Sequence, residues 1–163
     1  MKFGIALPLL SLFSLLTPSS AGSAPHGHAV VINNCADPFY LWSVGGSLGP
    51  RQKVEPGDNY SEAIHRDPVS GGIAIKITEG ENGLFNGSPQ MIFAYSLAGN
   101  GVWYDLSNVF GDPFGSHPVC VEPEKDQCPS ICWPEGTNPG GGNSVKSCTE
   151  GGDIVLTVCS SGC

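Results

Sequence analysis

The most regular pattern of hydrophobic and polar positions lies at residues 91–114. Residues 92–97 alternate, with Phe, Tyr and Leu on one side and Ile, Ala and Ser on the other, which predicts a half-buried β-strand. The Gly/Asn-rich tetrad 98–101 then separates two aromatic runs and predicts a hairpin turn. Because the chain returns at 102–106 as a second strand, this stretch predicts a β-hairpin at the centre of the fold.

Further strands are predicted at 29–33, 40–44, 73–78 and 153–159. In the third of these segments, three isoleucines share one face while Ala, Lys and Thr share the other. The first segment is nearly continuous in apolar residues, which predicts burial on both of its faces. No long helical period follows residue 21, so the pattern predicts an all-β protein.

The region 115–152 has a different composition. Gly, Pro, Cys and charged residues dominate it, and it contains four of the seven cysteines. A segment of this kind buries little apolar surface and needs covalent links to hold it. We therefore predict a disulfide-rich loop region here.

The N-terminal residues predict a secretory signal peptide rather than a part of the fold. Lys2 supplies a positive start, residues 3–16 are almost wholly apolar, and small residues precede the predicted cut after Ala21. The apolar run is too short to cross a bilayer comfortably. We predict a signal peptide at 1–21 and one mature domain at 22–163, located outside the cell or in the cell wall.

Charge narrows the function classes. The mature chain keeps six basic residues and all fifteen acidic residues, a formal net charge of −9. This sign argues against binding to nucleic acid or to an anionic membrane, and it fits a soluble extracellular monomer. His26 and His28 are candidate ligands for copper or zinc, but a frayed terminal loop is the favoured interpretation. We therefore predict no metal and no cofactor.

All seven cysteines lie in the mature chain. With a signal peptide in front of them, they predict disulfides rather than a metal site. The CxxxC spacing of Cys128 and Cys132 lacks a second ligand pair that would support zinc. Because seven is odd, one cysteine is left over, and the spacing does not order the bonds.

Several motifs resemble a known family. The run Tyr104-Asp105-Leu106-Ser107, followed by Gly111 and a Phe-containing turn, resembles the YDVS…GF segment of thaumatin-like proteins. The fuller run VWYDLSNVFGDPF resembles the Blastomyces yeast-phase-specific proteins, small secreted fungal proteins grouped with that fold. The V-I-N-x-C opening that ends at Cys35 also matches. The resemblance implies a disulfide-stapled thaumatin-like β-sandwich with a small or missing accessory domain.

The resemblance also implies part of the disulfide pattern. Thaumatin-like proteins join a cysteine after the first strand to one near the C-terminus, and these positions correspond to Cys35 and Cys159. Two more bonds would then form, in an order that stays open, among Cys120, Cys128, Cys132 and Cys148. Cys163 is the candidate for the odd thiol.

Larger thaumatin-like proteins have an acidic cleft with one Arg and four carboxylates, and some members bind or slowly cut β-1,3-glucan there. In this chain Ala94 and Val102 stand at two of the carboxylate positions, Asp105 is retained, and the Arg position falls at Lys76 or Ile77. Glycoside hydrolysis needs two carboxylates. We therefore predict no catalytic residue and keep Asp105 as the candidate cleft residue.

The residues of this candidate cleft also have structural interpretations. Asp105 is expected to be a strand-end side chain that accepts N–H bonds from a turn at 106–108. Trp42 and Trp103 suit sugar stacking, but we expect both in the core. Asp67 and Asp112 have no family counterpart.

Two sequons, at Asn59 and Asn86, predict N-glycosylation, and Pro89 weakens the second. The resulting hypothesis is a secreted, non-catalytic thaumatin-like protein that serves as an extracellular or cell-surface fungal antigen or allergen. Its expected partners are host antibodies, by family resemblance, and cell-wall polysaccharide such as β-glucan, bound weakly. The alternative is a weak β-1,3-glucan hydrolase or an antifungal protein.

Overall fold

The computed structural model describes Met1 and residues 26–140, 145–149 and 151–162. The predicted signal peptide beyond Met1 and the candidate odd thiol, Cys163, lie outside the described residues. No helix in the described part is long and apolar enough to cross a membrane.

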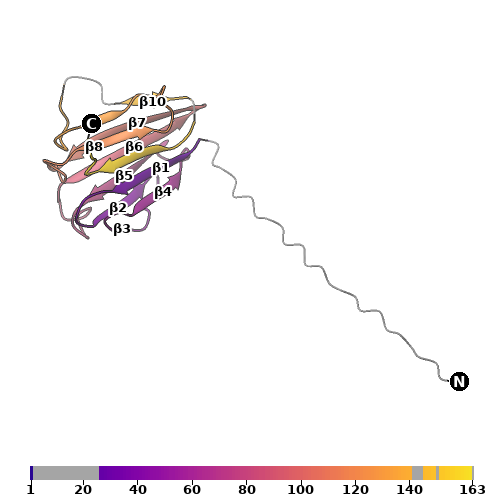
Figure 1. The fold of residues 1–163 in the computed structure, drawn as a ribbon, viewed down its shortest axis with the longest axis horizontal. Coiled ribbons are helices and arrows are strands. Elements are labelled where there is room, and N and C mark those ends of the chain that lie inside the picture. The colour runs from indigo at the N-terminus through magenta and orange to yellow at the C-terminus, as the bar shows by residue number, and fades with distance from the viewer. Residues whose placement is uncertain (2–25, 141–144, 150, 163) are drawn as a thin grey trace.

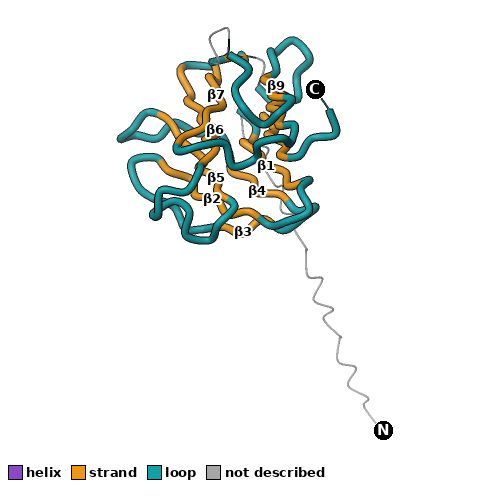
Figure 2. The backbone as a smooth tube through the Cα atoms, turned by 90° about the vertical axis from the view of Figure 1, so that its left-hand side faces the viewer, coloured by secondary structure: helices purple, strands orange, loops and turns teal. Residues whose placement is uncertain are grey.

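Two β-sheets face each other, as Figure 2 shows with β2, β5, β6 and β7 in one layer and β1, β4 and β9 in the other. The five-stranded sheet has the order β4 (Asn59–Ala63), β1 (His28–Asn33), β11 (Ile154–Val158), β8 (Val119–Pro123) and β9 (Ile131–Trp133). The six-stranded sheet has the order β10 (Lys146–Cys148), β7 (Gly101–Val109), β6 (Gln90–Ala98), β5 (Gly72–Thr78), β2 (Phe39–Val44) and β3 (Gln52–Val54). The predicted all-β sandwich is confirmed.

The predicted hairpin, β6 and β7, lies inside the six-stranded sheet between β10 and β5 (Figure 1). β6 and β7 pair antiparallel over nine residues each, and Ala98 pairs with Gly101 across a two-residue turn. Gly99 has φ +61°, which is the position where a type II′ turn requires glycine. Turn chemistry and alternation therefore fix the same register.

The core lies between the two sheets and follows from the period-two pattern of the strands. Ile73, Ile75 and Ile77 of β5 are at most 5% exposed, and Leu106 of β7 is fully buried. The same pattern corrects the expectation for 29–33. Only alternate residues of β1 are buried, because the outer face of this mostly antiparallel sandwich meets solvent.

The expectation for 115–152 is also wrong in part. This region contains β8, β9 and β10, and it contributes Val119, Val121 and Trp133, each at most 2% exposed, to the core. β9 and β10 have only three residues each, and the first three residues of β8 are all buried, so burial does not alternate there. Such short runs leave no periodic signal that stands out from a loop.

Three disulfides hold the described residues together. Cys35–Cys159 is the pair that the family resemblance implies, and it joins the residues that follow β1 and β11. β1 and β11 are parallel neighbours, so their carboxyl ends meet at one edge of the sheet. The two remaining bonds, whose order the sequence left open, are Cys120–Cys132 between β8 and β9 and Cys128–Cys148 between the β8–β9 loop and β10.

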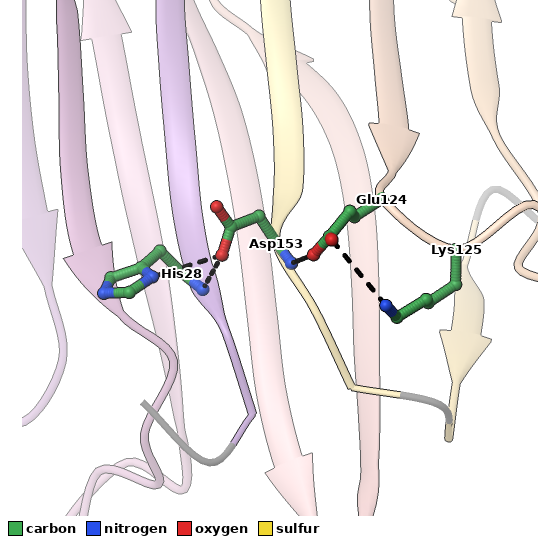
Figure 3. Close-up of polar contacts among 4 residues, drawn as sticks. All are labelled: His28, Glu124, Lys125 and Asp153. Carbon is green, nitrogen blue, oxygen red and sulfur yellow. Dashed lines mark hydrogen bonds and ion pairs between the residues drawn. The ribbon is translucent and has the colours of Figure 1, made fainter. Parts of the chain in front are cut away.

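A polar network joins the amino ends of β1 and β11, at the edge of the sheet opposite the Cys35–Cys159 bond (Figure 3). The Oδ1 of Asp153 accepts the backbone N–H of His28 at 2.8 Å and lies 3.1 Å from its Nδ1. The Oε2 of Glu124 accepts the backbone N–H of Asp153 at 3.1 Å, and Lys125 Nζ lies 3.6 Å from the other carboxylate oxygen. His28 therefore has a structural role, and no group of three possible metal ligands exists among the described residues.

Candidate functional site

Asp105 lies in the middle of β7, on the outer face of the six-stranded sheet. The expected turn at 106–108 is absent, because β7 continues to Val109. Asp105 is therefore not a strand-end cap, and the structural interpretation of this residue was wrong. The register places Ala94 of β6 directly opposite it and Ala74 of β5 beyond Ala94.

An open groove of about 390 Å³ crosses this face. We call it the sheet groove and define it by six of its lining residues, Gly72, Ala74, Ala94, Ser96, Trp103 and Asp105. Its floor consists of small residues from β5 and β6, so the flat backbone of the sheet lies close beneath the surface. The small floor and the larger side chains of β7 together form a shallow trough.

Trp103 corrects a second expectation. Its side chain is 48% exposed and lines the sheet groove, whereas Trp42 is buried at 3% exposure beside the edge of Phe85. Alternation along β7 explains the exposed position, because Tyr104 occupies the inward face and Trp103 must face outward with Asp105. The alternation of β7 was readable from the sequence and should have placed Trp103 outside.

The Asp105 carboxylate has no hydrogen-bond donor or cation as a partner among the described residues. Oδ1 is buried and accepts no hydrogen bond, and no ion pair of Asp105 is found among the described residues. Leaving a buried carboxylate oxygen unpaired costs free energy, and because the same side chain lines the groove, a donor on a ligand there would offset part of that cost. This orphan oxygen beside an exposed tryptophan marks the groove as the candidate site.

A second cluster connects the two sheets and was missed by sequence reasoning. Glu62 of β4 accepts hydrogen bonds from the hydroxyls of Tyr60, at 2.6 Å, and Tyr95 of β6, at 2.8 Å. His65 Nδ1 lies 3.3 Å from the Tyr95 hydroxyl and 2.9 Å from the carbonyl oxygen of Ala63. Burial first, and then the bond to Glu62, raises the pKa of both tyrosines well above the usual value.

Comparison with known proteins now decides the family. The family model described as Blastomyces yeast-phase-specific protein matches residues 16–160. The chain belongs to this family. It is a fungal thaumatin-like protein of the yeast-phase-specific type.

Two curated relatives support the assignment. The chain is 28% identical to the antigenic thaumatin-like protein of Arthroderma benhamiae over 173 residues, which cover 99% of this chain and 86% of the relative. It is 29% identical to the secreted thaumatin-like protein calA of Emericella nidulans over 166 residues, 92% and 95% of the two chains. The protein elicitor MoHrip2 from Magnaporthe oryzae has the same fold, with a TM-score of 0.68, 24% identity and coverage of 82% of this chain and 99% of that one.

The positions that the family resemblance aligns with the acidic cleft of larger thaumatin-like proteins lie on both faces of the six-stranded sheet. Of the matching positions, Val102 and Ile77 face the core, at 2% and 0% exposure. Lys76 lies on the outer face of β5, and Ala94 lies opposite Asp105. Asp105 is the one carboxylate among the described residues that line the groove.

The other acidic candidates have structural roles. Asp112 Oδ1 accepts a hydrogen bond from Asn108 Nδ2 at 2.6 Å. Asp67 Oδ1 accepts the N–H of Ser70 at 2.7 Å, its hydroxyl at 2.9 Å and the N–H of Val69 at 2.9 Å. Asp67 thereby orders the loop that carries Ser70, a residue of the groove rim.

The hydrogen bonds that Asp67 accepts lead to a prediction about the stability of the protein in acid. Backbone hydrogen bonds, first from Ser70 and then from Gly46, lower the pKa of Asp67 to about 2. Because the usual value is about 3.9, this contribution to stability is complete above pH 4 and is lost as the pH falls through 2. We expect an NMR titration of the Asp67 carboxyl to have its midpoint near 2. We expect Asp67→Asn to reduce the dependence of unfolding on pH between 4 and 2. The matched change Asp126→Asn, at an exposed position, should leave that dependence unchanged. An Asp67 midpoint near 4 would show that these hydrogen bonds do not stabilise the carboxylate.

The two sequons of the family member stay predictions. Asn59 is exposed at the start of the edge strand β4, and Asn86 is exposed in the loop between β5 and β6. The Oδ1 of Asn86 accepts both the N–H and the hydroxyl of Ser88, at 3.1 and 2.6 Å.

Proposed function

We propose that this protein is a secreted, non-catalytic thaumatin-like protein that binds cell-wall polysaccharide through the sheet groove. The observation that carries the proposal is Trp103, which is 48% exposed beside a floor of small residues. An exposed indole on a rigid strand suits stacking against the apolar face of a sugar ring, and it costs little conformational entropy to hold in place.

The absence of a carboxylate pair supports binding without cleavage. Hydrolysis of a glycosidic bond needs an acid and a second carboxylate about 5–10 Å apart. Asp105 has no acidic neighbour among the described lining residues, since Ala94 lies opposite it. One carboxylate serves to orient a ligand and does not supply both catalytic roles.

The relatives support a location outside the cell. One is named as secreted and the other as antigenic. Three disulfides among the described residues fit an oxidising compartment and a fold that resists local opening. We infer an extracellular or wall-bound protein that host antibodies recognise.

A sedimentation assay tests the binding role. The purified mature protein is mixed with insoluble β-1,3-glucan or chitin, and the pellet is assayed for protein and the supernatant for released sugar. We expect binding without release, and we expect Trp103→Ala to weaken binding about tenfold, because an aromatic contact is worth about 1–1.5 kcal/mol. Phe110→Ala, which removes another exposed aromatic side chain outside the groove, is the matched control.

Sugar release that disappears in an Asp105→Ala variant would replace this proposal with the hydrolase alternative. Equal binding by the wild-type protein and Trp103→Ala would move the site away from the sheet groove.

A further inference from the structure

We propose that the sheet groove selects saccharides that carry a protonated amine, so that a polymer of glucosamine units binds better than its N-acetylated or neutral counterparts. This inference rests on the proposed polysaccharide-binding function and names the substrate class. The observation behind it is the unpaired carboxylate of Asp105 next to the exposed face of Trp103.

The environment of the Asp105 carboxylate favours a cation over a neutral hydroxyl as its ligand. Oδ1 of Asp105 is buried without a hydrogen bond, and its neighbours across the strands are Ala94 and, farther on, Ala74. Lys76 lies on the same face of the sheet, but no ion pair joins it to Asp105 among the described residues. In an apolar setting, an ammonium group stabilises such a carboxylate more than a neutral donor does.

The tryptophan fits the same ligand group. Trp103 and Asp105 are two residues apart on one strand, so their side chains share a face and stand about 6.6 Å apart along it. This spacing is about the size of one sugar ring. A ring stacked on Trp103 therefore places an amine substituent near Asp105, where the indole face also attracts the positive charge.

The shape of the groove favours a sugar over a lysine-rich peptide. Its floor of Gly72, Ala74 and Ala94 is flat and open, and Ser96 pairs directly with Trp103 across β6 and β7. A flat floor next to an aromatic side chain fits a pyranose ring, and a hydroxyl beside it fits ring hydroxyls. The net charge of −8 for the full chain further attracts a polycation of linked amino sugars.

The test compares soluble oligomers of matched length with the mature protein at about pH 5.5, by titration calorimetry. The ligands are hexamers of glucosamine, N-acetylglucosamine and β-1,3-linked glucose, with oligolysine as the peptide probe. We expect the glucosamine hexamer to bind at least about tenfold more tightly than the others, since a charge-assisted hydrogen bond separates them. We expect added salt to weaken this binding in the wild-type protein.

The variants separate the two proposals. We expect Asp105→Asn to remove the preference for glucosamine, while Glu122→Gln, the same change at an exposed position on the other sheet, retains it. Equal, salt-independent binding of charged and neutral hexamers, unchanged in Asp105→Asn, would overturn this inference and leave wall binding intact. No binding of any saccharide would overturn both, and tighter binding of oligolysine would replace the sugar with a peptide partner.

Discussion

Replacing Cys35 and Cys159 together by alanine is expected to lower the free energy of unfolding by about 5 kcal/mol, the largest effect of any change considered. This disulfide links residues 124 positions apart, whereas the other two link residues 12 and 20 positions apart. In the chain-entropy model, the longest closed loop restricts the unfolded chain most. The bond also fastens the parallel pair β1 and β11, which lies at the centre of the five-stranded sheet.

The other disulfides provide matched controls. The same model predicts losses of about 3 kcal/mol for Cys120→Ala with Cys132→Ala and for Cys128→Ala with Cys148→Ala. Urea denaturation of the three double variants, compared with the intact protein, measures the ranking. Equal losses in all three would show that local packing, and not restriction of the unfolded chain, determines the contribution of each bond.

Alternation over five or more residues predicted strands well. The segments that became β5, β6, β7 and β11 carry a clear period of two, because one face packs in the core. The strands β3, β9 and β10 have three residues each, too few for the pattern to stand out, and β8 does not alternate, because its first three residues are all buried. The strand β4 was not predicted for another reason, because its inward positions hold Tyr60 and Glu62 rather than aliphatic residues.

The candidate site was predictable only in part. Asp105 was identified from the family resemblance, and the alternation of β7 was sufficient to place Trp103 beside it. The floor of the groove was not predictable, because Ala74 and Ala94 meet Asp105 only through the pairing of three strands. The contact between Glu62 and Tyr95 joins residues that are 33 positions apart and lie in different sheets. No local sequence pattern predicts such a contact.

The core and the groove depend on the same strand. Tyr104 and Leu106 of β7 are at most 1% exposed on the inner face, while Trp103 and Asp105 occupy the outer face. The inner packing therefore fixes the position of the binding residues with little freedom left in the backbone. The Tyr104 hydroxyl also donates to the carbonyl oxygen of Pro129, which attaches β7 to the loop between β8 and β9. Burial raises the pKa of Tyr104 to about 12, so this link persists through neutral pH.

Replacing Glu62 by alanine is expected to lower the free energy of unfolding by about 2–3 kcal/mol. The carboxylate accepts hydroxyl bonds from Tyr60 on its own strand and from Tyr95 on the opposite sheet, and its loss leaves two partly buried hydroxyls without an acceptor. Ser61→Ala, at an exposed position on the same strand, is the control and is expected to stay within about 0.5 kcal/mol of the wild-type protein. Urea denaturation at neutral pH gives both values.

Alkaline titration tests the electrostatic part of this role. Since the pKa of Tyr60 and of Tyr95 is raised in the folded protein, their contribution to stability is complete below pH 10 and is lost as the pH rises above that value. Without the Glu62 carboxylate, the folded protein is expected to form phenolate at a lower pH, as followed by ultraviolet absorbance. Glu62→Gln removes the charge but keeps an acceptor, so it should show the earlier titration with a smaller loss of stability. A Glu62→Ala variant as stable as the wild-type protein would mean that the two sheets are held by the core and the disulfides alone.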